Sequence, residues 1–417
     1  MNVFLNSERV GAIERRGPSR YRFTYSRVVV ESHQPAEIVL SASLPLRLET
    51  FSPSSTAPFF EGLLPEGTVR SSIARSFRLS EEDGFGLLRA LGADCAGAVA
   101  VISPEAEPPL PGGGGTRPLS DGDLTKLIED LPRHPLGIDP RDAGVRLSLG
   151  GIQQKLVLVG EPHSGFGQPL EGAPSNCLLK PEFGQYPDLV VNEAFCMKVV
   201  SAIGLRVADA DIFEVGQIRC LYVARFDRVI DKGHVVSRLH QEDMCQAMGI
   251  SPAAKYEDNG GPSVAGIVQL LRTLRGPYMA RDVNDFVHAV LVNFLLGNSD
   301  AHGKNFALLY EPDSGIRLAP LYDVVSTTVY PEVTDRMAMA IGGETEPARV
   351  DMDAWARLAE ECRLGGGISS IVRRRTAAVL RAVTDWQGIA VEQGWHSDVI
   401  DAIVDVCQAR AAQLLDS

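Results

Sequence analysis

The first hundred positions alternate apolar and polar residues over short stretches, and the last two hundred repeat apolar residues at helical spacing. Residues 20–30 and 38–44 have the alternation typical of strands, whereas residues 83–91 have the spacing of a helix. The apolar run 59–66 is expected to turn within a hydrophobic core. These patterns predict a small mixed domain near the N-terminus.

The middle of the chain predicts strands with one helix among them. Residues 145–148 and 155–159 flank a glycine pair and predict a hairpin, and 177–180 predict a third strand. A helix is expected at 190–204, closed by Gly204, and a second hairpin at 212–215 and 218–224 around Gly216. Further helices are expected at 241–248, 264–274, 283–296, 352–361, 369–382 and 398–415, and a strand at 306–310.

A run rich in proline and glycine, residues 105–118, cannot form a regular element and is expected to be a linker or loop. It divides an N-terminal domain of residues 1–104 from a β-rich lobe of residues 119–228. A helical lobe, residues 229–417, follows. The fold class predicted from this order is α+β.

Composition excludes several classes of protein. With 45% hydrophobic and 22% charged residues the chain is globular, and its net charge of −13 argues against a surface built to coat nucleic acid or anionic membranes. No apolar run is long enough to span a bilayer and no signal peptide pattern begins the chain, so a cytoplasmic protein is expected. The seven cysteines are scattered singly, which predicts reduced core residues.

The strongest chemical signal follows the helix predicted at 283–296. Asp300 and Asn305 have the Asp-x-x-x-x-Asn spacing of a protein-kinase catalytic loop, in which the aspartate accepts the proton of the attacking hydroxyl and the asparagine binds Mg²⁺. Asp323, eighteen residues after Asn305, stands where a kinase keeps its metal-binding aspartate, although no Asp-Phe-Gly triplet is present. By itself, such a polar cluster after a helix is also typical of a cap and turn.

Three further features follow kinase order. Gly150 and Gly151 allow backbone N–H groups to approach a phosphate, and Lys155 supplies charge. Lys180 ends a predicted strand, and Glu193 lies near the start of the next helix, as the lysine and glutamate of a kinase do. Only seven of the 40 basic residues are lysines, which makes each lysine informative. Together these features predict an ATP-dependent phosphotransferase.

The sequence resembles the HipA family, serine/threonine-kinase toxins of bacterial toxin–antitoxin modules. The resemblance rests on seven segments spread over about residues 1–345: 59–66, 148–155, 224–228, 241–245, 255–261, 299–305 and 322–323. It implies a protein-kinase-like fold of two lobes, the N-lobe rich in strands and the C-lobe helical, preceded by a small N-terminal α/β domain. It also implies that ATP and Mg²⁺ are the cofactors.

The resemblance assigns a role to each matching position. Asp300 is the expected catalytic base, Asn305 and Asp323 are the expected metal ligands, and Ser148 is the expected site of inhibitory autophosphorylation. A phosphoserine there adds up to two negative charges beside the loop that holds the ATP phosphates. The residues expected to bind the nucleotide are Gly150, Gly151, Ile152, Gln153, Gln154, Lys155, Lys180, Ala224, Arg225, Phe226, Asp227, His302, Gly303, Lys304, Asn305, Tyr322 and Asp323.

The family also implies partners. A HipB-like helix-turn-helix antitoxin would bind the chain and carry most contacts to operator DNA, which agrees with the acidic net charge. The expected protein substrate is an aminoacyl-tRNA synthetase, with glutamate–tRNA ligase as the first guess, and no membrane partner is expected. The basic run 373–375 is more typical of a solvated helix face than of a DNA contact.

Two alternatives stay open at this point. The same catalytic spacing occurs in kinases of lipids and small molecules, so the loop alone does not identify the acceptor. The chain could also be a nucleotide-binding corepressor without catalysis, although such a protein has no physical need for Asp300, Asn305, Asp323 and Lys180 together.

Overall fold

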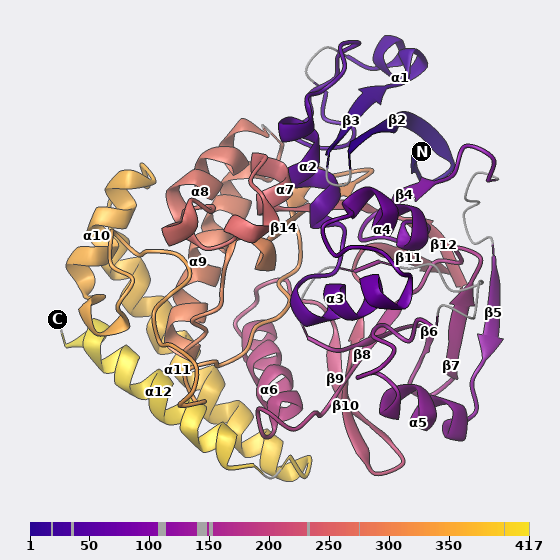
Figure 1. Cartoon of the computed structure of the whole chain (residues 1–417). Coiled ribbons are helices and arrows are strands. Elements are labelled where there is room, and N and C mark those ends of the chain that lie inside the picture. The colour runs from indigo at the N-terminus through magenta and orange to yellow at the C-terminus, as the bar shows by residue number, and fades with distance from the viewer. Residues whose placement is uncertain are drawn as a thin grey trace. The chain divides into compact units, whose positions relative to one another are not determined.

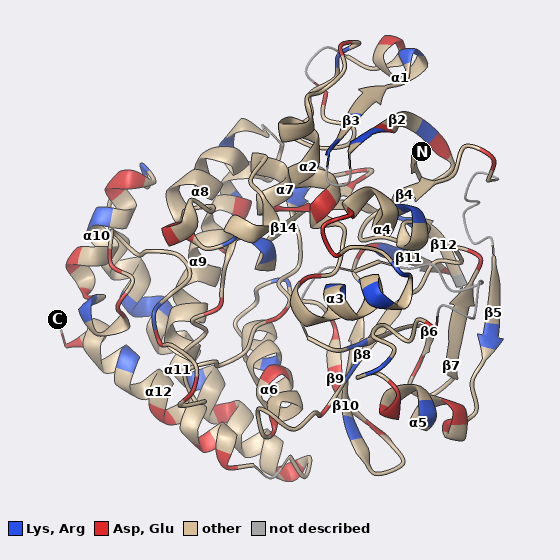
Figure 2. Cartoon of the chain, in the orientation of Figure 1, with Lys and Arg blue, Asp and Glu red and all other residues tan. Residues whose placement is uncertain are grey.

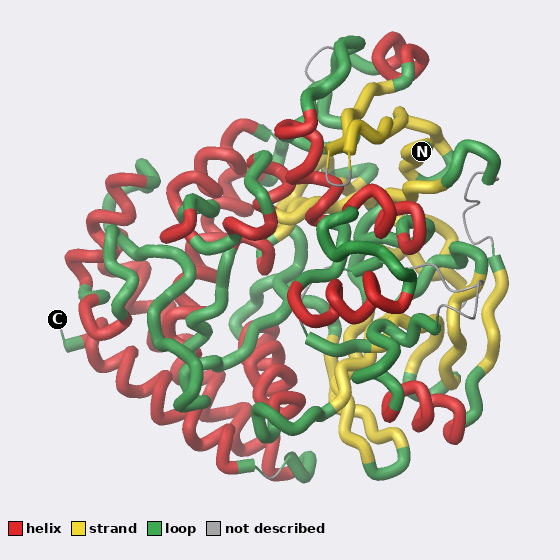
Figure 3. The backbone as a smooth tube through the Cα atoms, viewed as in Figure 1, coloured by secondary structure: helices red, strands yellow, loops and turns green. Residues whose placement is uncertain are grey.

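The computed structural model describes residues 1–17, 20–34, 37–106, 114–139, 148–149, 153–231, 234–274, 276–395 and 397–416. The chain forms two compact units. Unit 1 contains Met1–Pro181, Phe213–Ala253 and Leu309–Glu311, and unit 2 contains Glu182–Ile212, Ala254–Leu308 and Pro312–Ser417. Most strands belong to unit 1, and unit 2 is mainly helical (Figure 3).

Unit 1 begins with a four-stranded antiparallel sheet in the order β3-β2-β1-β4. Three helices follow between β3 and β4 in addition to the short α1, and side-chain caps from Ser26, Ser52 and Asp83 begin α1, α2 and α4. The elements of this part are β1 (Asn2–Leu5), β2 (Glu8–Gly17), β3 (Arg20–Tyr25), α1 (Arg27–Ser32), α2 (Pro53–Gly62), α3 (Gly67–Ser76), α4 (Gly84–Leu91) and β4 (Val99–Ile102).

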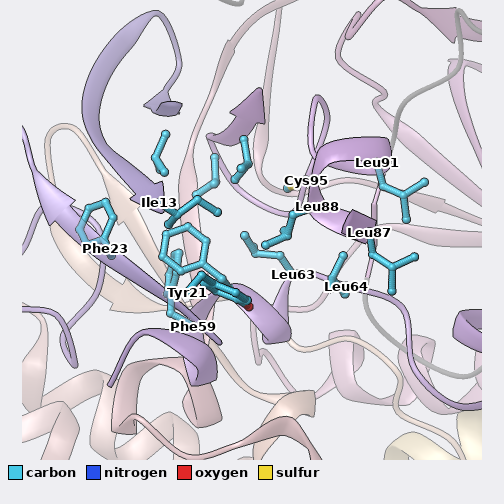
Figure 4. Close-up of a cluster of buried hydrophobic side chains, with 14 of the residues drawn as sticks. Ile13, Tyr21, Phe23, Phe59, Leu63, Leu64, Leu87, Leu88, Leu91 and Cys95 are labelled. Atoms are coloured by element: carbon cyan, nitrogen blue, oxygen red, sulfur yellow. The ribbon is translucent and has the colours of Figure 1, made fainter. Parts of the chain in front are cut away.

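The core of this part joins aromatic rings of β3 and α2 to leucines of α4 (Figure 4). Phe23 and Phe60 are fully buried with ring centroids 5.6 Å apart, and the ring of Phe59 meets that of Phe60 edge to face. Leu63 and Leu64 are buried directly after α2. The prediction that the run 59–66 belongs to the core is confirmed, although its first four residues are helical.

A six-stranded sheet in the order β5-β7-β6-β8-β10-β9 forms the rest of unit 1, together with α5, whose Leu124 and Ile128 join the sheet's hydrophobic core. The chain leaves unit 1 after β8 and returns within β9 (Figure 1). The elements are β5 (Gly115–Pro118), α5 (Asp121–Glu129), β6 (Leu156–Glu161), β7 (Gly165–Leu170), β8 (Cys177–Pro181), β9 (Ala210–Val215) and β10 (Ile218–Ala224).

Short elements complete this unit and lead to the next. β11 (Arg228–Asp231) and β12 (His234–Arg238) pair as a two-stranded ribbon. A small sheet has the order β13-β14-β15, and the chain crosses between the units within β14. Its strands are β13 (His240–Asp243), β14 (Ala307–Glu311) and β15 (Gly315–Leu318), and the accompanying helices are α7 (Met244–Met248) and the 3₁₀ turn η1 (Pro252–Ala254).

Unit 2 is built around α9, which is apolar and buried on nearly all its faces, as expected for a central helix. α8 and α12 pack against α9, and α11 packs against α6, α9, α10 and α12. The elements are α6 (Leu189–Ala202), η2 (Glu257–Asn259), α8 (Val264–Thr273), α9 (Met279–Leu296), η3 (Gly303–Asn305), η4 (Pro347–Arg349), α10 (Met352–Glu361), α11 (Ile368–Glu392) and α12 (Asp398–Leu415).

Five predicted elements are wrong or partly wrong. The helix expected at 369–382 is α11, which continues ten residues further to Glu392. Residues 26–30 leave β3 and enter α1, and residues 38–44 form a loop with one isolated bridge, Ser41 to Leu44. The helix expected at 241–248 begins only at Met244, because 240–243 form β13. Residues 115–118 of the expected linker form β5, an edge strand, where Pro118 is tolerated. β6 pairs with β7 and β8, and residues 145–147 of its expected hairpin partner lie outside the described residues.

All seven cysteines are buried and none forms a disulfide bond among the described residues, which confirms the prediction of reduced core residues. In the part of the chain that the structure describes, no helix combines the length and apolar character needed to cross a membrane.

Candidate active site

The catalytic loop predicted from the Asp-x-x-x-x-Asn spacing follows α9 directly. α9 ends at Gly297, which has a left-handed backbone with φ of 78°. A Cβ atom at this position would lie 2.3 Å from the hydroxyl of Thr328, so the turn requires glycine. The loop therefore starts from a fixed point at the end of the most buried helix of unit 2.

Side-chain amides then hold the loop in shape. Asn298 donates to Asn293 Oδ1 over 2.7 Å, and its own Oδ1 accepts from the backbone N–H of Asp300. The Asn305 amide donates to the backbone carbonyl of Asp300 over 3.1 Å, which closes the loop between the two residues. This contact leaves Oδ1 as the atom of Asn305 suited to a cation. The side chain of Asp300 is 47% exposed, as a proton acceptor for an external hydroxyl must be.

Asp323 is held beside the same loop. The Tyr322 hydroxyl donates to the backbone carbonyl of Lys304 over 2.6 Å, which ties the segment of Asp323 to the segment of Asn305. Asp323 has a left-handed backbone with φ of 52°, an uncommon state for a residue other than glycine that aspartate tolerates better than most. Such positions cluster at functional sites. Asn192 of α6 fixes the following Ser326 through both its amide atoms.

The oxygens of Asn305 and Asp323 suit Mg²⁺, which binds hard oxygen ligands and commonly completes its shell with phosphate and water. Among the described residues no three histidine, cysteine, aspartate or glutamate side chains gather as a metal cage. Two protein ligands on a half-open loop are the arrangement expected where a nucleotide supplies the remaining oxygens.

His302 is buried in the same loop. Burial, followed by the charge of Lys255, lowers the pKa of His302 to about 3, so the ring is neutral at neutral pH. Its Nε2 lies 3.9 Å from Oδ2 of Asp300. Because the ring is neutral, the two side chains do not form an ion pair. Nδ1 is buried without a hydrogen-bond partner within the described residues. Gly303 lies so close to Pro262 that a Cβ atom would approach its ring to 2.5 Å.

Unit 1 holds the other predicted nucleotide residues. Lys180 is buried on β8 opposite Leu221 of β10, and Ala224 ends β10 opposite Cys177. Arg225 continues the pairing, because its N–H donates to the carbonyl of Asn176. Gln153, Gln154 and Phe226 are half-buried and Lys155 is buried. Gly150, Gly151 and Ile152 lie outside the described residues.

The resemblance places Asp227 among the residues that bind the nucleotide, and its contacts are those of a structural ion pair. Both carboxylate oxygens accept from Arg225, and Oδ2 also accepts from the backbone N–H of Gly97. The side chain is buried, and although burial raises its pKa, the guanidinium groups of Arg225 and Arg228 outweigh burial and lower it overall. The nucleotide-binding role of Asp227 therefore stays a prediction.

Asp227 belongs to a buried cluster of five charged residues: Asp94, Arg225, Asp227, Arg228 and Arg238. We call it the ionic cluster. It joins the N-terminal sheet region, which contributes Asp94, to the strands that carry the expected nucleotide residues. The ionic cluster could not be predicted from the sequence, because Asp94 is more than 130 positions from its partners and no local pattern marks it.

Ser148 is fully buried in unit 1. Its hydroxyl donates to the carbonyl of Leu63 over 2.7 Å, and its N–H donates to the carbonyl of Asp94 over 2.8 Å. Because the hydroxyl is fully buried and bonded to a carbonyl, it is not accessible to a phosphoryl donor in this arrangement.

Comparison with known proteins decides the family. Residues 147–387 match the family described as HipA-like C-terminal domain, and residues 1–102 match the HipA N-terminal domain. The chain belongs to the HipA family of kinase toxins. The resemblance stated from the motifs is thus confirmed.

Individual relatives agree with the assignment. "Putative kinase Y4mE" of Sinorhizobium fredii is 36% identical over 97% of this chain and 96% of its own length. The serine/threonine-protein kinase toxin HipA of Shewanella oneidensis is 33% identical over 78% of this chain and 75% of its own.

A solved structure supports the fold. The complex of HipA, HipB and operator DNA from Shewanella oneidensis MR-1 contains a chain that matches all of this HipA-family chain and 97% of its own length, with a TM-score of 0.83 and 28% identity. The predicted kinase-like α+β fold is confirmed. Homology therefore identifies this chain as a kinase, and the geometry of its catalytic loop agrees with that assignment.

The basic run of α11 has structural partners in unit 2. Arg373 donates to the carbonyl of Leu415, and Arg375 donates to the side chain of Asn284. Figure 2 shows acidic as well as basic segments along α11 and α12, so this surface is not uniformly positive.

Proposed function

We propose that the chain is an ATP- and Mg²⁺-dependent serine/threonine protein kinase that acts as the toxin of a toxin–antitoxin module. One observation carries the proposal. In the catalytic loop, a hydrogen bond from the Asn305 amide to the carbonyl of Asp300 links the two residues, and the Asp300 side chain is half-exposed. The hydrogen bond from Tyr322 to Lys304 holds the neighbouring Asp323 beside this loop. This is the set of groups that phosphoryl transfer to a hydroxyl requires.

In this proposal each residue has a separate task. Asp300 accepts the proton of the attacking hydroxyl, and Asn305 and Asp323 hold Mg²⁺, which neutralises phosphate charge when bound. Lys180, buried on β8, pairs with phosphate as a compact charge. The segment from Ala224 to Phe226, at the end of β10, is proposed to meet the adenine through its backbone.

Autophosphorylation of Ser148 is the proposed means of inactivation. The hydroxyl has to leave its hydrogen bond with Leu63 before it can accept a phosphoryl group, because the site is closed. Once modified, a group with nearly two negative charges cannot return to that pocket without a large desolvation cost. The modified segment therefore stays outside that pocket.

The partners are proposed from the homologous complex. The Shewanella oneidensis relative was solved with HipB and operator DNA, and we propose a helix-turn-helix antitoxin of the same kind, which carries most DNA contacts. The net charge of −13 supports that division. The proposed substrate is an aminoacyl-tRNA synthetase, with glutamate–tRNA ligase tested first.

The deciding experiment is intact mass and peptide mapping after incubation with Mg·ATP, for wild type and Asp300→Asn. We expect one phosphate at Ser148 in wild type and none in the variant. Asp313→Asn, which changes an exposed aspartate of the same unit, is the matched control and should behave as wild type. ATP binding without any transfer, to itself or to synthetases, would favour the non-catalytic alternative, and transfer to lipids or sugars alone would favour the other kinase class.

A further inference from the structure

The segment 255–262 packs on the catalytic loop within unit 2, and neither the motif resemblance nor the kinase pattern gives it a task. The Tyr256 hydroxyl donates to Oδ1 of Asp300 over 2.6 Å. A phenol bonded to a carboxylate at this distance is a charge-assisted hydrogen bond, stronger than one between neutral groups. It reaches the very side chain proposed to accept the substrate proton.

Tyr256 is itself held in place. Its backbone carbonyl accepts from the N–H groups of Asn259 and Gly261, over 3.0 and 2.9 Å. Gly261 has no room for a side chain there, because a Cβ atom would lie 2.6 Å from the same carbonyl oxygen. The ring packs edge to face on His302 with centroids 5.3 Å apart. The tyrosine is thus a fixed donor, which an exposed tyrosine would not be.

His302, which lies in the same loop, does not make this contact. It is neutral at neutral pH and approaches Asp300 only to 3.9 Å, which is outside hydrogen-bond range. The Asp300 side chain is nearly half exposed, and the terminal torsion of an aspartate is broad, so a hydrogen bond from a fixed donor restricts the orientations of the carboxylate. Proton transfer requires one of them.

We infer that Tyr256 is a positioning residue, which orients the Asp300 carboxylate toward the acceptor hydroxyl through the hydrogen bond to Oδ1 and the packing of its ring on His302. The inference rests on the proposed function, because it gives Asp300 the task of the base. It assigns to the segment 255–262 the role of a support for the catalytic loop.

The test is a double-mutant cycle of Tyr256→Phe and Asp300→Ala, measured as phosphate transfer from radiolabelled ATP with Mg²⁺ present. The phenylalanine keeps the ring on His302 and removes the donor. We expect Tyr256→Phe to lower kcat about 10- to 100-fold, as a misplaced catalytic group does, with KM for ATP changed less than about 2-fold. In the Asp300→Ala background the same substitution should change the residual rate less than about 2-fold.

Tyr278→Phe is the matched control. It removes a phenol hydroxyl from the same unit at the start of α9, roughly 27 Å along the helix from the catalytic loop, and should leave kcat unchanged. The melting temperature of each variant shows whether the fold is kept.

The outcomes separate the two proposals. An active wild type with an unimpaired Tyr256→Phe overturns the inference alone. An equal loss in the wild-type and Asp300→Ala backgrounds also overturns it, since the effect would then not pass through Asp300. A wild type without any phosphate transfer overturns the proposed function and the inference with it.

Discussion

The ionic cluster of unit 1 makes a strong prediction about stability, tested by Arg228→Met. The guanidinium of Arg228 has no exposed surface and donates to the carbonyls of Ser175 and Gly97 and to Oδ1 of Asp94. Burial, followed by repulsion from Arg225, lowers the pKa of Arg228 to about 10, so it remains charged at neutral pH. Methionine of similar length fills the space and removes every donor.

The expected loss of unfolding free energy follows from the buried groups that lose their partner when Arg228 is replaced. The cluster contains three guanidinium groups and two carboxylates, so it holds one more positive than negative charge. Losing Arg228 relieves that excess, but it leaves buried carbonyl oxygens without a donor, at about 1 kcal/mol each, and weakens the pairing of Asp94. Removal of one partner from a buried ion pair costs about 3–5 kcal/mol, and we expect that range.

Arg238 is the matched control in the same cluster. It lies 3.4 Å from Asp94 and donates to the carbonyl of Gly172, but its Nη1 has no hydrogen-bond partner among the described residues. It is therefore the excess cation, and Arg238→Met should cost no more than about 1–2 kcal/mol. The reasoning requires this asymmetry between two buried arginines that contact the same aspartate.

The assay has to report on unit 1. All three tryptophans, Trp355, Trp386 and Trp395, belong to unit 2, so fluorescence follows the wrong unit. Hydrogen exchange by mass spectrometry at increasing urea, on peptides covering residues 94–102 and 220–228, gives the opening free energy where the cluster lies. Equal losses for Arg228→Met and Arg238→Met, or a loss below about 1 kcal/mol for both, would refute the account.

Three further predictions concern single side chains. Ser148→Ala should lower stability by about 1 kcal/mol and abolish phosphate at that position, while transfer to other proteins continues after wild type has stopped; peptide mapping over time checks both. Asp323→Asn should keep the fold, since asparagine also tolerates the left-handed backbone, yet raise the Mg²⁺ needed for half-maximal transfer at least about 10-fold; unchanged Mg²⁺ dependence would remove Asp323 from the metal site. Burial, followed by the charge of Arg375, lowers the pKa of His288 to about 3. Below about pH 6.5 the imidazole is therefore protonated in the unfolded chain but not in the folded chain, so the free energy of unfolding falls as the pH drops. At pH 5 the cost is about 2 kcal/mol, and urea midpoints at pH 5 and 7.5 should differ less for His288→Leu than for wild type.

Helices with local signals could be predicted to the residue. α10 and α12 begin and end where the apolar spacing places them, since Asp351 and Ser397 supply the N-caps within the same short segment. α6, expected at 190–204, runs from Leu189 to Ala202, and β9 and β10 form the expected hairpin; Gly204 and Gly216, which follow α6 and β9, have a left-handed backbone. The apolar spacing, caps and turn glycines that determine these elements all lie within a few residues of them.

The failures depend on distant partners. Leu40 and Leu44 are buried and alternate as in a strand, but Ser41 between them donates to Glu242, two hundred residues away, and the segment bends around that contact. The same Glu242 lies in β13, which replaces the first part of the helix expected at 241–248. A sheet partner that lies far along the chain leaves no trace in the local pattern.

The candidate site also contains residues that a local segment predicts and residues whose contacts depend on distant parts of the chain. The spacing of Asp300 and Asn305 was predictive because one short loop, closed by its own hydrogen bond, carries both residues. Tyr256 stood in a segment that the resemblance included without a role, and only the fold brings its hydroxyl to Asp300. The resemblance placed Asp227 at the nucleotide, and only the fold shows that its carboxylate pairs with Arg225 in the ionic cluster.

This contrast has a chemical basis in the two kinds of basic residue. A guanidinium carries five donors and can satisfy several buried carbonyls at once, so arginine suits a buried cluster such as the one around Asp94. Lysine has a compact charge and is rarely buried, yet four of the seven lysines here are at most 9% exposed: Lys155, Lys180, Lys255 and Lys304. Lys155, Lys180 and Lys304 are predicted to bind the nucleotide, and the carbonyl of Lys255 accepts from the N–H of Gly303 in the catalytic loop. In this chain the buried lysines therefore lie at or beside the positions proposed for the reaction, whereas the arginines around Asp94 belong to the scaffold.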